Sequence, residues 1–424
     1  MRDLLITLLI FGAVPYILKR PHIGVLVWSW IGYMNPHRYT WGFAYNMPFA
    51  QITAIALFIG MIFSKEEKTF PVNAITVVWS LFIAWAVIST LFAFNIDNSM
   101  VELVRFVKIQ IIVLATLMLI NSKNRLFQLI WVIVVSIGFF GVKGGIFSIA
   151  TGLKYSVTGP PESFISGNTE IALAILMVIP LMYFLKVHTT NKLLQWALVG
   201  SMLLCAIAVI GSYSRGAFLA GIVTLIFLWS GMRRRVTTAI IVIALAMAIV
   251  PFIPEKWYER MDTIDNYQED DSAMGRINAW TMAFNLANDH PLTGGGFRSF
   301  TAENFAIYAP NPEAVHDAHS IYFEVLGEMG YVGLLLFLVL WVLVFLKARG
   351  LRKVAGRNDD LKWLADLAKM TQVSLLAYLS GGAFLGLAFF DLPYHLMCLI
   401  VISAILLKNE TQQARSAYPQ PRCA

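Results

Sequence analysis

Long apolar runs recur along almost the entire chain, and they limit the possible folds more than any other feature of the sequence. An apolar helix of about 20 residues spans the hydrocarbon core of a bilayer. Because the first two runs are short and can join as two half-spans across residues 19–22, we predict about twelve transmembrane helices. About thirteen runs occur, at 4–18, 23–34, 49–63, 72–94, 106–120, 126–150, 171–185, 194–213, 216–231, 237–253, 331–346, 371–390 and 394–407.

The overall composition excludes a soluble globular protein. Hydrophobic residues make up 58% of the chain and charged residues only 13%, whereas about 25% of the residues in soluble domains are charged. The sequence lacks the alternating polarity of barrel strands. We therefore predict an all-α polytopic membrane protein, whose N-terminal run lacks a small-residue cleavage site and is retained as an anchor.

The positions of lysine and arginine predict the orientation of the helices. Basic residues collect in every second connection, at 65–68, 123–125, 186–192, 233–235, 347–369 and 408. Cytoplasmic loops of membrane proteins carry this excess. The loops at 35–48, 95–100, 151–170 and 254–330 then lie on the outer side of the membrane. Basic residues at the cytoplasmic ends of the helices also explain the net charge of +7. We therefore do not expect nucleic acid as a partner.

The chain divides into four parts on this basis. An N-terminal transmembrane bundle covers 1–253, an outer loop covers 254–330, further transmembrane helices cover 331–408, and a cytoplasmic tail covers 409–424. The loop contains thirteen of the 25 acidic residues and four of the 32 basic residues, so its net charge is −9 and that of the remainder is +16. Polar loops on a rigid scaffold commonly carry function.

Arg215 stands out because it lies at a predicted helix hairpin tip between two apolar runs, on the side where arginine is disfavoured. A charged residue bracketed by membrane segments is a functional candidate by default. The alternative is an interfacial arginine held by lipid headgroups. We favour the functional interpretation.

Arg276 and Arg298 are isolated positive charges in the acidic loop, and Arg298 follows the glycines Gly294, Gly295 and Gly296. A guanidinium binds phosphate oxygens in a bidentate manner, and glycines allow close backbone approach. Each arginine could instead pair with a local carboxylate.

His319 is the candidate for proton transfer, because an imidazole accepts a proton near neutral pH. We expect a helix to begin at about Ala318 and to run into the following span. On that helix Glu324 and Glu328 would lie nearly opposite His319, which disfavours a His–Glu dyad. We expect no metal site and no cofactor, because His316 and His319 have few further ligands nearby and the three cysteines lack metal-ligand spacing.

Arg105 and Lys108, at the outer start of a predicted span, and Lys143, between apolar residues and glycines, are secondary candidates, because each could contact an anionic headgroup or pair with Glu102. Asp391 and His395 flank a proline at a predicted outer turn and remain ambiguous.

An ordered series of short motifs resembles the O-antigen ligase and polymerase superfamily. The resemblance covers about residues 170–345, and the N-terminal part of the chain is similar to proteins described as O-glycosylation ligases. Ser320 departs from the family, which more often has asparagine after the histidine. The motifs are Ser214-Arg215-Gly216-Ala217, Gly275-Arg276 with Trp280, the glycines 294–296, His319-Ser320, Glu328-Met329-Gly330, Val332-Gly333, and Asn35-Pro36-His37-Arg38.

This resemblance implies a membrane-embedded glycosyltransferase of the C type (GT-C) in the bacterial inner membrane. The enzyme would transfer O-antigen from undecaprenyl diphosphate to lipid A-core oligosaccharide at the periplasmic face, with inversion and without a metal. Arg215 and Arg276 would bind the diphosphate, and His319 would deprotonate the acceptor. An O-antigen chain polymerase and an O-oligosaccharyltransferase acting on protein are alternatives. A lipid-linked oligosaccharide transporter is the alternative from another class, but it would need charges along a path through the bilayer.

Overall fold

The computed structural model describes residues 1–230 and 271–417, and every structural statement below concerns these residues. The predicted span at 237–253, the basic cluster at 233–235 and the first part of the acidic loop, 254–270, lie outside the described residues.

The described residues form α-helices and short 3-10 helices and contain no strand, which confirms the all-α class. Six of these helices are long and apolar enough to cross a membrane: α4, α6, α7, α8, α14 and α16. The count of about twelve spans therefore stays a prediction. The helices are α1 (Arg2–Lys19), α2 (His22–Met34), η1 (Pro36–Tyr39), η2 (Phe43–Asn46), α3 (Phe49–Phe63), α4 (Ala74–Leu91), α5 (Ile96–Leu119), α6 (Lys123–Ala150), α7 (Asn168–His188), α8 (Lys192–Ile210), α9 (Arg215–Ser230), α12 (Asp271–Asp289), α13 (Ala302–Tyr308), α14 (Ile321–Ala355), η5 (Asp359–Leu361), α15 (Lys362–Gly381), η6 (Gly382–Phe384) and α16 (Asp391–Ala417).

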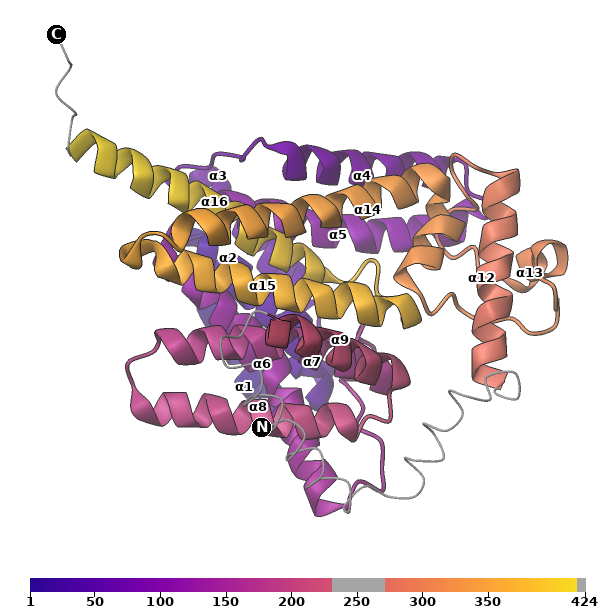
Figure 1. Ribbon diagram of the computed structural model, residues 1–424, viewed down its shortest axis with the longest axis horizontal. Helices are drawn as coiled ribbons and strands as arrows, with labels where there is room; N and C mark the ends of the chain where they lie inside the picture. The colour runs from indigo at the N-terminus through magenta and orange to yellow at the C-terminus, as the bar shows by residue number, and fades with distance from the viewer. Residues whose placement is uncertain (231–270, 418–424) are drawn as a thin grey trace, which may run out of the picture.

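Most of the long helices run side by side in a bundle, and α12 lies across one end of it (Figure 1). Helix α14 packs against α4 and α15, α15 packs against α7 and α9, and α6 packs against α7 and α8. Large aromatic side chains fill the centre, where Trp341 contacts Tyr378 and Tyr394 with ring centroids 5.5 Å apart in each pair. This end-on position of α12 brings the second half of the predicted loop to the bundle.

Polar side chains determine where several helices begin. The side chain of Asn73 accepts hydrogen bonds from the backbone of Ile75 and Thr76, and Asn95, Ser122 and Asn191 cap α5, α6 and α8 in the same way. Such caps satisfy backbone donors that the first turn of a helix leaves without partners.

The connections gather into two groups that match the predicted sides. On one side, Arg38 pairs with Glu162 at 2.8 Å, and the backbone of Phe94 donates to Gly295 at 3.1 Å. On the other, Arg125 pairs with Glu66 at 2.9 Å. Segments predicted to share a compartment therefore contact each other. The assignment of each side to a compartment stays a prediction.

Helix α14 breaks at Gly330, which has a φ of +67°. A Cβ atom there would lie 2.5 Å from the carbonyl oxygen of Leu292. Only glycine meets both conditions without strain, because left-handed backbone and close approach both exclude a side chain. The break separates the short segment 321–329 from the long apolar part of α14.

Candidate functional site

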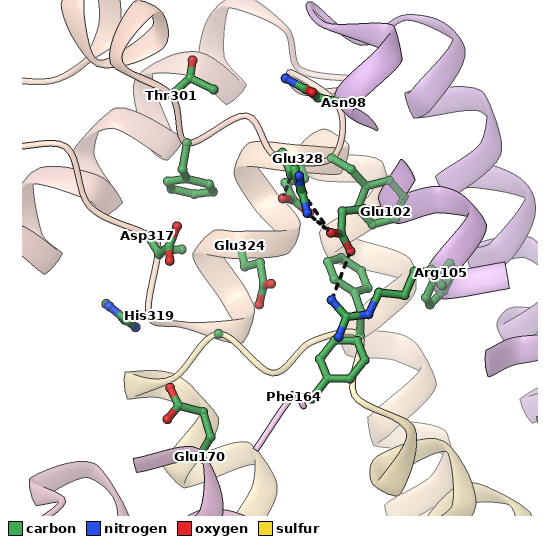
Figure 2. A pocket seen from close by; sticks show the side chains of 17 residues that line it. Asn98, Glu102, Arg105, Phe164, Glu170, Thr301, Asp317, His319, Glu324 and Glu328 are labelled. Atoms are coloured by element: carbon green, nitrogen blue, oxygen red, sulfur yellow. Dashed lines mark hydrogen bonds and ion pairs between the residues drawn. The ribbon is translucent and has the colours of Figure 1, made fainter. Parts of the chain in front are cut away.

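A polar cavity of about 480 Å³ lies where α5, the start of α7, the segment after α12 and the start of α14 meet. Figure 2 shows its acidic and basic side chains facing one another. The apolar part of the wall comes from phenylalanines. The charged and titratable lining residues are Glu102, Arg105, Glu170, Arg298, Asp317, His319, Glu324 and Glu328, and the aromatic ones are Phe106, Phe164, Phe297, Phe300 and Phe389.

His319 lines this cavity. Its backbone is left-handed, with a φ of +41°. Ser320 is the N-cap residue, so α14 begins at Ile321 and not at Ala318. A left-handed histidine is uncommon and costs about 1–3 kcal/mol, and such strain is concentrated at functional sites.

The surroundings of His319 keep its imidazole neutral. Burial lowers its pKa below 6.5, and the positive charges of Arg276 and His316 lower the pKa further, while Asp317 and Glu170 raise it. Burial is the largest of these effects because a charged imidazole loses hydration in the half-buried position. A neutral imidazole can accept a proton at neutral pH.

The expectation that His319 belongs to the same helix as Glu324 and Glu328 is wrong, because α14 begins at Ile321; whether a His–Glu dyad forms stays a prediction. The angle of about 100° per residue applies only within a helix, and His319 lies in the left-handed turn before α14. All three side chains line the same cavity (Figure 2).

Arg298 also lines the cavity, and it too has a left-handed backbone, with a φ of +58°. Its guanidinium binds Glu102, with Nε 3.0 Å from Oε1 and Nη2 in contact with the same oxygen. Its backbone N–H donates to Oε1 of Glu328 at 2.8 Å. Of the two interpretations of Arg298, this geometry favours pairing with a local carboxylate.

The three glycines before Arg298 contact protein backbone. Gly295 donates to the carbonyl of Gly327 at 2.9 Å, and Gly296 donates to that of Glu328 at 3.0 Å. Gly294 and Gly296 have φ values of +62° and +83°. They therefore dock the loop on the segment 321–329 and are not part of the cavity lining.

Arg276 lies on α12, is half-buried, and is not among the residues that line the cavity. It acts on His319 electrostatically, as the pKa effect shows. Its helix also holds the histidine loop, because Nε1 of Trp280 donates to the carbonyl of Ala318 at 2.7 Å. The Trp280 ring stacks on Phe323 with centroids 5.0 Å apart.

Arg215 is the first residue of α9 and is not in the cavity lining either. A Cβ atom on the neighbouring Gly216 would lie 3.0 Å from Phe384 of η6, and one on Gly382 would lie 2.6 Å from Ile321. The hairpin tip thus reaches the start of α14 through η6. Arg215 and His319 therefore belong to parts of the chain that both lie near η6, but they do not line the same cavity.

The secondary candidates separate into three places. Arg105 lines the polar cavity. Its Nη1 lies 3.8 Å from Oε2 of Glu102, and its guanidinium carbon lies 3.8 Å from the centre of the Phe164 ring. Lys108 lines a neighbouring, mostly apolar cavity of about 440 Å³, which Arg105 also borders. Lys143 lies over Tyr39 at 5.3 Å and lines a third cavity, which shares no lining residue with the polar cavity.

Three acidic residues of the cavity have only a weak signal in the sequence. The sequence indicates Glu102 only as a possible ion-pair partner of a nearby basic residue, and it gives no distinct signal for Glu170 or Asp317. Glu170 lies in the first turn of α7, where a carboxylate also suits the helix dipole. The local sequence signal therefore resembles that of an ordinary helix start.

The fold and the cavity define an all-helical membrane protein with a polar site at one end of its bundle. Residues 200–338 match the family model described as O-antigen ligase, and this match supports an O-antigen ligase-family protein. Residues 1–190 match a model described as a family of unknown function (DUF5935). No curated protein matches the chain. The family implies a glycosyltransferase-like ligase or polymerase activity, with a lipid-linked glycan and an acceptor as partners.

Proposed function

We propose that the protein transfers O-antigen from undecaprenyl diphosphate to lipid A-core oligosaccharide at the periplasmic face of the bacterial inner membrane. It would be a GT-C-type glycosyltransferase with about twelve transmembrane helices. The observation that carries this proposal is the position of His319, a neutral, strained imidazole at the wall of a polar cavity within the family region.

In the proposed reaction, His319 removes the proton of an acceptor hydroxyl while that oxygen attacks the anomeric carbon of the donor sugar. The bond between this carbon and the diphosphate oxygen breaks, and the diphosphate leaves with the electron pair. Attack from the face opposite the leaving group inverts the configuration. No metal is needed if fixed cations stabilise the departing anion.

Arg276 and Arg215 are the proposed diphosphate ligands. The positive charge of Arg276 lowers the pKa of His319. Arg215 is the first residue of α9, and α9 contacts η6. A guanidinium supplies charge and two parallel hydrogen bonds to phosphate oxygens. The pairing of Arg298 with Glu102 supports a positioning role for Arg298 in the cavity wall in place of direct diphosphate contact.

Two other acceptors are compatible with the same donor and chemistry. A growing glycan would make the protein an O-antigen polymerase, and a protein hydroxyl would make it an O-oligosaccharyltransferase. A lipid-linked oligosaccharide transporter fits less well, because the charged residues of the cavity lie near the starts of α5, α7 and α14 and not along a path through the bundle.

The test is an acceptor competition with purified protein and undecaprenyl diphosphate-linked glycan. Lipid A-core, a serine-containing peptide and a second donor molecule are offered together, and each product is quantified by mass spectrometry. We expect sugar to appear on lipid A-core. Transfer to the peptide or to the donor would replace the ligase assignment with the corresponding alternative, and no transfer to any of the three would refute the glycosyltransferase proposal.

A further inference from the structure

The third cavity, which Lys143 lines, lies where η1, the last turns of α6 and the loop 151–167 meet. Its volume of about 330 Å³ falls within the range of roughly 300–1,000 Å³ that is typical of small-ligand sites. It shares no lining residue with the polar cavity. The proposed reaction therefore leaves this cavity without a role.

Lys143 is the one charged side chain among the described residues that line this cavity. Its ammonium nitrogen lies 5.3 Å from the centre of the Tyr39 ring. It forms no ion pair or hydrogen bond with any described residue. A cation–π contact leaves the three N–H donors of the ammonium available. An anion in the cavity would therefore meet a positive charge and no competing carboxylate.

Hydroxyl groups lie around this charge. Tyr39 and Thr158 line the cavity, and neither hydroxyl forms a hydrogen bond with another described residue. The loop that carries Thr158 is held in place, because the backbone N–H of Val157 donates to the carbonyl of Gly211 at 3.1 Å. Hydroxyl donors together with an ammonium can bind the oxygens of a phosphate group.

The position of Lys143 along α6 favours a ligand from the membrane. Helix α6 ends at Ala150, so at a rise of about 1.5 Å per residue Lys143 lies roughly 10 Å below the predicted outer end of the span. That depth is close to the boundary between headgroups and acyl chains, where a lysine extends toward the headgroups. Because lysine is disfavoured on the outer side, a specific anionic partner explains its presence.

Exposed apolar side chains continue from the cavity over the surface of α6. Phe140, Lys143 and Phe147 have the spacing i, i+3 and i+7, which places them on one face of the helix. Phe147 is 41% exposed, and the neighbouring Ile146 is 55% exposed. A free phosphate would leave this surface uncovered, whereas an acyl chain attached to the phosphate would cover it.

We propose that this cavity binds the headgroup of an anionic glycerophospholipid, with the phosphodiester on Lys143 and Thr158 and an acyl chain along Ile146 and Phe147. A zwitterionic headgroup fits less well, because no acidic residue is among the described lining residues and the Tyr39 ring already faces the lysine. The glycerol headgroup of phosphatidylglycerol is uncharged and needs no carboxylate. The proposal goes beyond the proposed function and does not depend on it.

The test maps lipid contacts by photo-crosslinking. The probes are phosphatidylglycerol and phosphatidylcholine, each with a diazirine on the acyl chain close to the glycerol, as minor components of phosphatidylcholine nanodiscs that hold the full-length protein. Peptide mass spectrometry quantifies the label on residues 139–161. We expect about fivefold more label from phosphatidylglycerol, which is the factor that one lysine contributes to anionic-lipid binding. Equal labelling by the two probes, or no label on this segment, would overturn the proposal.

Variants connect the label to this cavity. Lys143→Gln should reduce the label from phosphatidylglycerol about fivefold, and Thr158→Val should reduce it roughly twofold. Lys143→Arg keeps the charge and should keep the label. Lys154→Gln removes an exposed lysine of the same loop that is not in the lining, so it should leave the label unchanged.

The Tm of each variant in the same nanodiscs shows whether it is folded, and Thr158→Val decides the question if Lys143→Gln does not fold. Full labelling of a folded Lys143→Gln variant would contradict the proposed site.

Unlabelled competitors identify the class of ligand. Phosphatidylglycerol should displace its probe from residues 139–161, whereas inorganic phosphate should not, and undecaprenyl diphosphate should displace it less well than phosphatidylglycerol. Displacement by inorganic phosphate would assign the cavity to a free anion. Stronger displacement by undecaprenyl diphosphate would assign it to an isoprenoid lipid. Either result would refute the phospholipid proposal.

Discussion

His319 is the residue on which the proposed chemistry depends, and its protonation determines the pH range of activity. Groups from three segments act on it: Arg276 on α12, Glu170 on α7, and His316 and Asp317 in its own loop. Burial and the positive charges lower its pKa below 6.5. The imidazole is therefore neutral at neutral pH and gains a proton only as the pH falls through the lowered pKa.

We expect Arg276→Gln to raise the pKa of His319, because the substitution removes a positive charge that disfavours the imidazolium. The rate at which diethyl pyrocarbonate modifies His319, followed by peptide mass spectrometry, reports the neutral fraction against pH. The wild-type midpoint should lie below pH 6.5, and the variant midpoint should lie at higher pH. Arg298→Gln serves as the control, because Arg298 is not among the causes of this shift. An unchanged midpoint in the Arg276 variant would remove the electrostatic link.

At the scale of helices, the break in α14 holds Glu324 and Glu328 at the cavity while the rest of the helix packs in the bundle. Gly327 and Glu328 accept hydrogen bonds from the glycine loop, and Leu292 approaches Gly330. The hydroxyl of Ser89 on α4 also donates to the carbonyl of Glu328 at 2.7 Å. The site therefore depends on the break as much as on the side chains.

Gly330→Ala should destabilise the protein by about 1–3 kcal/mol or more, because alanine is strained at positive φ and its Cβ would approach a carbonyl oxygen. Thermal unfolding in detergent measures the effect as a lower Tm. The matched control is Gly350→Ala on the same helix, where a Cβ atom would meet nothing within 4 Å. That variant should be neutral or up to about 1 kcal/mol more stable, since alanine favours helix. Equal Tm values for the two variants would contradict this account of the break.

At the scale of the whole molecule, the two groups of connections predict which side chains face each compartment. Glu313 in the loop before α14 and Asp359 between α14 and α15 are both exposed, and these connections lie at opposite ends of the bundle (Figure 1).

A cysteine-labelling experiment tests this orientation. In a background without Cys423, a membrane-impermeant maleimide added to spheroplasts should label Glu313→Cys and not Asp359→Cys. Both cysteines should react after the cells are broken. The reverse pattern would invert the predicted topology and would place the cavity in the cytoplasm.

The sequence predicted the helical class well and the geometry of the site only in part. Apolar runs determine that helices form, because membrane burial acts on about 20 residues together. Arg105, Arg298 and His319 line one cavity, whereas Arg215 and Arg276 do not line it, so their shared role stays a prediction. The start of α14 at Ile321, by contrast, depends on the left-handed turn at His319, which local propensity disfavours.

The grouping of acidic residues in the polar cavity could not be predicted, because these residues come from distant segments of the chain. Glu102 lies on α5, Glu170 lies on α7, and Asp317 precedes α14. Only tertiary packing brings them together, and each is an ordinary polar residue in its local sequence. The partner of Arg298 was likewise undetermined, because a local carboxylate and a ligand phosphate satisfy a guanidinium equally well.

The most direct test of the account compares glycan transfer by purified wild-type protein and by His319→Ala under single-turnover conditions, with lipid-diphosphate-linked glycan and saturating acceptor. Loss of a general base should reduce the rate by about 10²–10⁴-fold, with an unchanged Tm and unchanged donor binding. Transfer by the His319 variant at the wild-type rate would contradict the assignment of His319 as the base and, with it, the proposed site.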